Sequence, residues 1–159
     1  MARQCSVNIE NTSMFTLCNV MSYSNSGFCD VPLPPRLSPS ENGSAVYRKT
    51  PNTARGAVAV FTYDICWKCE DQAIEKIAVM FSNPYDFASG SNWYAVGVFR
   101  KETVCDYALY NEMYNKVQNR FVRGKASQGS LTYSGSSVTI SANMSDSYKP
   151  VLKVNVYNK

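Results

Sequence analysis

The chain has 159 residues, of which 45% are hydrophobic and 18% are charged, and its formal net charge is +4. This size and composition predict one globular domain, residues 1–159, with a single hydrophobic core. The sequence has no apolar run long enough to cross a bilayer as a helix, and no block of Lys and Arg that would indicate a nucleic-acid partner.

The first part of the chain is predicted to form short strands. Residues 4–9 alternate apolar and polar side chains, as a half-buried strand does, and residues 15–18 begin a second strand. Residues 31–39 hold four of the seven prolines, so we expect a surface connection there. Residues 45–48 are a short strand candidate. Residues 56–63 are apolar enough to predict a central strand.

Two apolar runs, at residues 77–81 and 94–99, predict two more strands with a loop between them. One proline and four aromatic residues mark this loop: Pro84, Tyr85, Phe87, Trp93 and Tyr94. A rigid aromatic loop suits a bilayer interface, because Trp and Tyr carry an apolar body with a polar tip. The same rings also suit a small satellite core, and the loop alone does not decide between the two.

A helix is predicted over residues 106–117, with Asp106 as its N-terminal cap. An apolar stripe at four-residue spacing is expected to be buried, and it consists of Leu109, Met113 and Val117. A second stripe about 100° round the helix consists of Tyr107, Tyr110 and Tyr114. These tyrosines fit either the edge of the core or a surface that faces the loop aromatics.

The chain is predicted to return to strands at residues 130–133, 138–142 and 151–157. The total is about eight to ten short strands and one helix. Eleven Tyr and seven Phe also favour β structure. The predicted fold class is therefore mainly β, a β-sandwich with a flanking surface helix.

Six cysteines occur, at Cys5, Cys18, Cys29, Cys66, Cys69 and Cys105. Three disulfides would allow fifteen pairings, and a chain of this size does not need them to fold. Cys66 and Cys69 have the spacing of a zinc knuckle or a redox pair, but no second pair follows and the chain has no His. We therefore interpret them as loop cysteines, and expect neither a metal site nor a cofactor.

No set of residues suggests an enzyme. Without His there is no His-dependent nucleophile, and no pair of carboxylates stands out. Three Asn-x-Ser/Thr sequons, at Asn11, Asn42 and Asn143, are compatible with a secreted glycoprotein.

Several motifs together carry a family resemblance. The sequence reads MFSNPYD at residues 80–86, SNWY at 91–94 and LYNEMY at 109–114, with GAV at 56–58 and RG at 123–124. This combination resembles the actinoporins, the small pore-forming cytolysins of sea anemones that have relatives in other animals. The similarity runs with almost no gaps from Arg3 to at least Gly124.

The resemblance implies a β-sandwich with flanking helices and a first membrane contact through an aromatic loop and a tyrosine-bearing helix. The head group of a choline lipid, preferably sphingomyelin, would lie between them. By position, the implied head-group residues are Ser26, Val58, Ser82, Pro84, Tyr110 and Tyr114. The implied interfacial aromatics are Phe87 and Trp93, to which the loop pattern adds Tyr85 and Tyr94, and Arg3 would lie near a hinge.

Four positions depart from the family pattern. Ser89 and Gly90 stand where the family usually has a tryptophan and a tyrosine, and Asn115 replaces a further tyrosine. Lys125 replaces the acidic residue of the family's Arg-Gly-Asp. The aromatic cluster is therefore expected to be thinner than in the toxins.

The resemblance also bears on pore formation and location. The toxins place a long amphipathic helix before the position of Arg3, where only Met1 and Ala2 stand here, so we expect vesicle binding with little dye release. We expect a secreted protein that acts at a target-cell membrane, with a cytoplasmic location as the alternative since no cleavable leader follows Met1. It would be a monomer or small oligomer in solution and a homo-oligomer on the membrane.

A lectin is the alternative function. Fungal fruit-body lectins have a similar architecture and bind sugars, for which Tyr, Asn, Ser and Arg side chains on loops are also suitable. Glycans are therefore the alternative partners.

Overall fold

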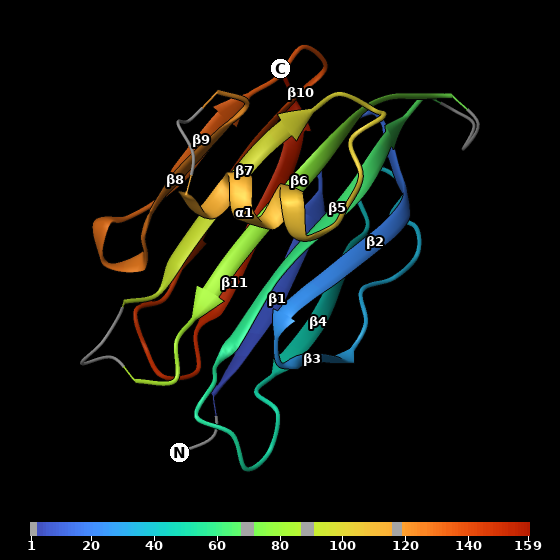
Figure 1. Ribbon diagram of the computed structural model, residues 1–159. Helices are drawn as coiled ribbons and strands as arrows, with labels where there is room; N and C mark the ends of the chain where they lie inside the picture. The colour runs from blue at the N-terminus through green and yellow to red at the C-terminus, as the bar shows by residue number, and fades with distance from the viewer. Residues whose placement is uncertain (1–2, 68–71, 87–90, 116–118) are drawn as a thin grey trace.

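The computed structural model describes residues 3–67, 72–86, 91–115 and 119–159. Within these ranges, eleven strands form two sheets that face each other, and one α-helix lies on the outside of one sheet (Figure 1). The predicted fold class, a β-sandwich with a flanking surface helix, is confirmed.

The six-stranded sheet has the strand order β3-β4-β1-β11-β10-β9. Its strands are β1 (Gln4–Asn11), β3 (Phe28–Val31), β4 (Asn42–Arg48), β9 (Leu131–Ser134), β10 (Val138–Met144) and β11 (Val151–Asn158). Strands β1 and β11 pair in parallel, and the other pairs are antiparallel. The sheet therefore joins the first and last strands of the chain at its centre.

The five-stranded sheet has the order β2-β5-β6-β7-β8, and all of its pairs are antiparallel. Its strands are β2 (Thr16–Ser26), β5 (Ala57–Cys66), β6 (Ala73–Asn83), β7 (Trp93–Phe99) and β8 (Phe121–Lys125). The helix α1 (Tyr107–Asn115) lies across this sheet, and a short 3-10 helix, η1 (Ala126–Gln128), follows β8.

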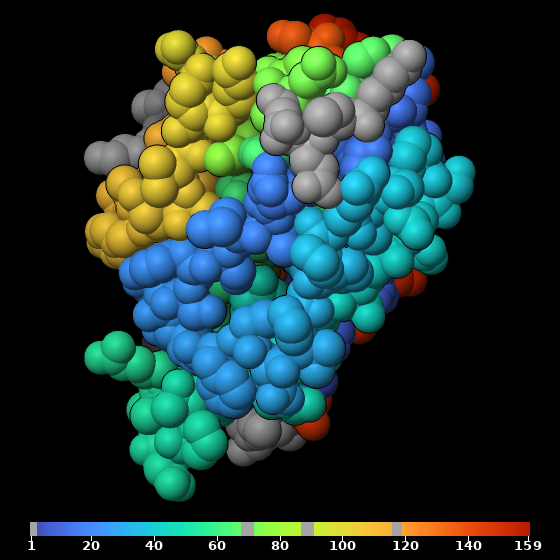
Figure 2. Space-filling model, turned by 90° about the vertical axis from the view of Figure 1, so that its right-hand side faces the viewer, coloured from blue at the N-terminus to red at the C-terminus, as the bar shows by residue number. Residues whose placement is uncertain are grey.

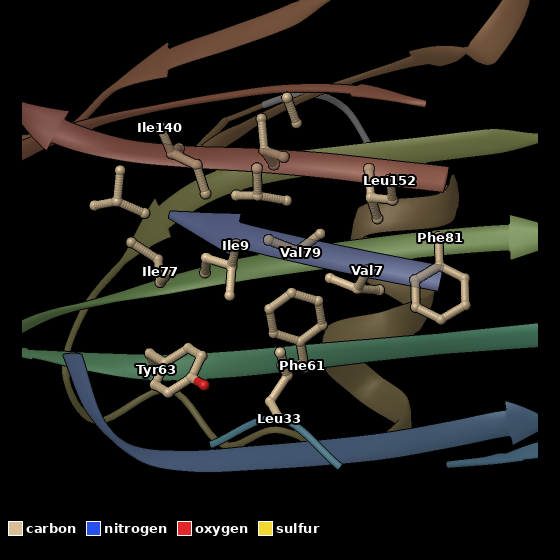
Figure 3. Close-up of a cluster of buried hydrophobic side chains, with 14 of the residues drawn as sticks. Val7, Ile9, Leu33, Phe61, Tyr63, Ile77, Val79, Phe81, Ile140 and Leu152 are labelled. Carbon is tan, nitrogen blue, oxygen red and sulfur yellow. The ribbon is translucent and has the colours of Figure 1, made fainter. Parts of the chain in front are cut away.

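The main core fills the space between the two sheets (Figure 3). Val7 and Ile9 of β1 meet Phe61 of β5 and Val79 of β6, and all four side chains are fully buried. Burying such a side chain stabilises the fold by about 1.5–3 kcal/mol. The period-2 alternation that predicted β1 is therefore the pattern of its contacts with the opposite sheet.

A second, outer cluster lies between the five-stranded sheet and α1. Leu109 and Met113 of the helix are buried there, and the small side chains Ala78 and Ala95 leave room for the helix to approach the sheet. Because α1 covers its outer face, β5 is buried on both sides, as its continuous apolar sequence predicted.

The N-terminal cap of α1 is the predicted one, since the Leu109 N–H donates to Asp106 Oδ1 at 3.1 Å. Val117, the third residue of the predicted apolar stripe, lies outside the described residues. In the part of the chain that the structure describes, no helix is both long and apolar enough to span a bilayer.

The proline-rich segment is a connection, as predicted. It runs beside β2, as Figure 2 shows, and Leu37 exchanges two backbone hydrogen bonds with Leu17 of that strand, at 2.7 and 2.9 Å. Leu33 and Leu37 are both buried, so the segment closes one side of the main core. Residues 49–56 project beyond the sandwich at the end where the N-terminus lies (Figures 1 and 2).

The expected count of eight to ten strands is too low, because β3 and β8 were not predicted. The β8 sequence, Phe-Val-Arg-Gly-Lys, is short and contains Gly, which is rare in strands. It becomes a strand by pairing with β7 along its length. Pairing partners are set by the tertiary fold, and local sequence does not reveal them.

The interpretation of Cys66 as a loop cysteine is wrong. Cys66 ends β5, is fully buried and forms a disulfide with Cys18 of β2, while Cys69 lies outside the described residues. Cys5 is free and lies in the main core, where burial raises the pKa of its thiol.

The three sequons differ in accessibility. Asn11 is fully buried, and its amide donates to the backbone oxygens of Phe15 and Leu37 at 2.8 and 3.0 Å. Asn42 and Asn143 are exposed on the outer face of the six-stranded sheet. Asn11 is therefore closed to modification in the folded chain.

Candidate functional site

Strand register brings four of the predicted site residues into one row across the five-stranded sheet. From β2 to β8 the paired neighbours are Ser26, Val58, Ser82, Trp93 and Lys125. Val58 packs in the outer cluster, so this row lies on the face of the sheet that carries α1. Residues between 11 and 32 positions apart in sequence are thus adjacent in space because neighbouring strands fix them.

Two glycines allow three chain segments to meet at the start of this row. A Cβ on Gly56 would lie 1.9 Å from the Asn83 oxygen, and a Cβ on Gly27 would lie 2.3 Å from the Arg48 oxygen. Gly27 also has φ +81°, which side-chain-bearing residues rarely adopt. These contacts place Ser26 and the half-buried Pro84 at the same end of the sheet as Val58.

The helix adds a chain of tyrosine rings beside the row. Ring centroids are 6.4 Å apart for Tyr23 and Tyr107, 6.1 Å for Tyr107 and Tyr110, and 5.8 Å for Tyr110 and Tyr114. Tyr107 is 54% exposed, Tyr110 is 8% exposed and Tyr114 is half-buried. Tyr110 therefore lies at the edge of the core, as the first alternative predicted, while Tyr107 is exposed to solvent, and contact of this stripe with the loop aromatics stays a prediction.

Tyr110 keeps its proton at physiological pH. Its pKa is raised to about 12, mainly by burial and also by the nearby Tyr114 and Tyr107, while a hydrogen bond with Asn25 acts in the opposite direction. Its hydroxyl is therefore a neutral group that can donate a hydrogen bond.

Two cations of β8 lie over the ring of Trp93. The Arg123 guanidinium is 4.3 Å from the Trp93 ring centroid and 5.9 Å from that of Tyr114, and the Lys125 ammonium is 5.7 Å from that of Trp93. Sequence reasoning did not include these cations in the site because it missed β8. The β8 sequence does not alternate apolar and polar residues regularly, so it offered no periodic signal for this strand.

The loop between β6 and β7 is fixed at both ends. Asn83 and Asn92 are fully buried, and the Asn83 amide donates to Asn92 Oδ1 at 2.9 Å. The Asn92 amide in turn donates to the Ser147 backbone oxygen at 2.8 Å, which ties in the loop between β10 and β11. Phe87, with Ser89 and Gly90, lies outside the described residues.

Arg3 and Tyr85 belong to a separate group at the same end of the molecule. Arg3 is 6% exposed, and its Nε and Nη2 donate to the Tyr85 backbone oxygen at 2.8 and 2.5 Å. Its guanidinium lies 4.0 Å from the Tyr148 ring centroid, and the Lys49 ammonium lies 5.4 Å from that of Tyr85. Arg3 thus connects the start of β1 to the aromatic loop, and its role as a hinge stays a prediction.

Tyr94 corrects the sequence interpretation. We expected it among the interfacial aromatics, but it is fully buried in the main core and its hydroxyl donates to the Gly129 backbone oxygen at 2.5 Å. Trp93 and Tyr94 are consecutive in a strand, so they point to opposite faces of the sheet. Trp93 faces α1 and Tyr94 faces the other sheet.

Comparisons with known proteins agree on the family. The family model described as "Sea anemone cytotoxic protein" matches residues 1–157. DELTA-alicitoxin-Pse1b of Phyllodiscus semoni is 33% identical over 114 residues, which is 71% of this chain and 48% of that toxin. Bryoporin of Physcomitrium patens is 31% identical over 113 residues, which is 71% of this chain and 61% of that protein. The chain therefore spans about half the length of the curated relatives that it matches.

Solved structures share the fold. The lipid binding protein Nakanori has a TM-score of 0.76 at 11% identity, with 99% of this chain and 71% of that chain covered. The Xerocomus chrysenteron lectin has a TM-score of 0.55 at 11% identity, with 98% of this chain and 99% of that chain covered. At these identities the likeness concerns the fold alone. With the family match over nearly its whole length, the chain belongs to the sea anemone cytotoxic protein family, the actinoporins.

Proposed function

We propose that this chain binds membranes by holding the phosphocholine head group of a lipid between the sheet row Ser26 to Lys125 and the tyrosines of α1. The observation that carries the proposal is that the sheet row and the tyrosine face of α1 are in contact. Val58 in the middle of the row packs in the same cluster as Tyr110 and Tyr114 of the helix.

The tyrosine chain suits the choline end of the head group. A quaternary ammonium is attracted to the faces of aromatic rings by roughly 0.5–2 kcal/mol per ring. Tyr107, Tyr110 and Tyr114 offer successive rings along one helix face, at centroid spacings of 6.1 and 5.8 Å. Several weak contacts of this kind select a choline over a primary amine, which keeps its own hydration.

The other side of the site suits the phosphate. Ser26 and Ser82 flank Val58 in the row and bring hydroxyl donors, while Arg123 and Lys125 bring positive charge at the β8 end. A choline close to Arg123 would be repelled. The head group therefore lies with its ammonium against the tyrosine rings of α1, on the side away from the Arg123 guanidinium, and with its phosphate toward β8.

The aromatic loop would rest in the interfacial region of the bilayer. Trp93 is half-buried beside the site and Tyr85 is 41% exposed, so both have ring surface available to lipid. The net charge of +4 assists approach to anionic membranes. Family membership supports a cytolysin-like role for a secreted protein at target membranes, with several copies assembling there.

Co-sedimentation with vesicles tests this proposal. We expect the protein to sediment with sphingomyelin and phosphatidylcholine vesicles, to do so less with phosphatidylethanolamine-rich vesicles, and to be displaced by soluble phosphocholine. Ile74→Ala is the control for variants of the site, and it should sediment like the original chain, because Ile74 is 43% exposed on β6 at the end opposite the site. No sedimentation with either choline lipid would refute lipid binding, and binding to glycans alone would identify a lectin instead.

A further inference from the structure

The outer face of the six-stranded sheet carries polar side chains that the lipid site does not use. This sheet lies behind the five-stranded sheet in Figure 1, so its outer face points away from α1. Apolar residues of β1, β10 and β11 point to the main core, and the alternate positions point outward.

Strand pairing arranges these outward residues in two adjacent rows. One row is Ser44, Asn8, Lys153 and Asn143. The next is Asn42, Glu10, Asn155, Ser141 and Thr132. Each member therefore lies beside hydrogen-bonding side chains on the neighbouring strands.

The use of asparagine here conflicts with strand propensity. Asn is depleted in strands, and an ordinary solvated sheet face favours residues such as Thr. Yet Asn8, Asn42, Asn143 and Asn155 occupy outward positions on four neighbouring strands, β1, β4, β10 and β11. Residue types with a low propensity for the secondary structure that they occupy are expected where a surface has a function.

The rows also line a hollow. It has a volume of about 150 Å³, and besides the backbone neighbours Ala142 and Val154 its lining is polar: Glu10, Ser130, Ser141, Asn143, Lys153 and Asn155. A second hollow of about 160 Å³ adjoins it and shares Glu10 and Lys153. Both hollows are open to solvent and wide enough for water molecules. A ligand with several hydroxyl groups can replace such waters without leaving polar groups unpaired.

Charge and polarity restrict the class of ligand. The hollow contains one acidic and one basic side chain, Glu10 and Lys153, so it has no net charge to attract a polyanion or an anionic membrane. It lacks the apolar, aromatic centre of a protein interface. One aromatic ring, Tyr157, lies on the same face two residues beyond Asn155, paired with Thr139 of β10.

We propose that this face binds a neutral carbohydrate. The amides and hydroxyls of the two rows donate to and accept from sugar hydroxyls, Glu10 accepts from a pair of them, and the hollow holds one sugar ring. Tyr157 offers its ring to an apolar face of a neighbouring sugar. The glycan site does not depend on the proposed lipid site, because the two lie on opposite sheets.

The test uses protein made in bacteria, so that Asn42 and Asn143 carry no glycan. The probe is an array of neutral hexose and N-acetylhexosamine oligosaccharides, printed together with sialylated and sulfated ones. We expect the original chain to bind at least one neutral glycan. Glu10→Ala and Asn155→Ala should each bind that glycan at least about tenfold more weakly. Asn115→Ala is the control, since it also removes an exposed asparagine but on α1.

Several results would overturn the proposal. They are no binding to any neutral glycan, binding to acidic glycans only, and neutral-glycan binding that both variants retain. Melting temperatures check that the variants fold, and vesicle sedimentation of the same variants separates this site from the lipid site. Loss of glycan binding with unchanged sedimentation supports the assignment to this face.

Discussion

Replacing Tyr114 by alanine separates a binding role from a packing role. Tyr114 is half-buried at the rim of the outer cluster, with its ring 5.8 Å from that of Tyr110 and 5.9 Å from the Arg123 guanidinium. An aromatic pair contributes about 0.5–1.5 kcal/mol, and a cation over a ring at an exposed site adds about 0.5–1 kcal/mol.

Tyr114→Ala should therefore lower the free energy of unfolding by about 1–2.5 kcal/mol. For a chain of this length, each kcal/mol corresponds to roughly 2–4 °C in Tm, so the expected loss is roughly 2–10 °C. The loss of one choline–ring contact should also weaken vesicle binding roughly 2- to 30-fold. Thermal unfolding by circular dichroism measures the first effect, and sedimentation with sphingomyelin vesicles measures the second.

Tyr114→Phe distinguishes the ring from the hydroxyl. It keeps the aromatic face, so we expect a Tm close to that of the original chain and binding at most a few-fold weaker. If Tyr114→Phe binds as poorly as Tyr114→Ala, the aromatic face is not what holds the choline. If Tyr114→Ala binds like the original chain, the ring serves packing only.

Three further predictions concern charge, pH and the disulfide. Lys125→Glu should weaken sedimentation with vesicles several-fold at low salt and reduce the salt dependence of sedimentation, because a cation over Trp93 is lost. Lys101→Glu, in an exposed turn, is the control and should change neither quantity. Tm should fall as pH rises above about 10, since the unfolded chain releases the Tyr110 proton before the folded chain does, and an unchanged Tm up to pH 12 would contradict the burial of this hydroxyl. Reduction should lower the free energy of unfolding by about 2–4 kcal/mol through loss of the Cys18–Cys66 link, and Cys18→Ser should be insensitive to reductant.

Sequence patterns predicted those parts of the fold that depend on local periodicity. The alternation in β1, the continuous apolar run of β5 and the cap of α1 each reflect contacts of one element with its immediate surroundings. The missed β8 has no such signal, because its five residues are a strand only through pairing with β7. The cations Arg123 and Lys125 were missed with it.

The candidate site also divides into residues that the sequence identified and residues that only the tertiary structure places. The family resemblance implied Ser26, Val58 and Ser82, and strand register explains why they are neighbours. Tyr94 was misplaced because the loop pattern does not give the face of the sheet to which a residue points. Strand parity would have separated it from Trp93 once the start of β7 was known.

Titration of the isotope-labelled protein with phosphocholine, followed by NMR, tests the central claim most directly. We expect chemical-shift changes at Ser26, Val58, Ser82, Arg123 and the α1 residues 107–114, while the outer face of the six-stranded sheet stays unchanged. Shift changes confined to that opposite face, or no changes at tens of millimolar phosphocholine, would contradict a head-group site between the sheet row and the tyrosine helix.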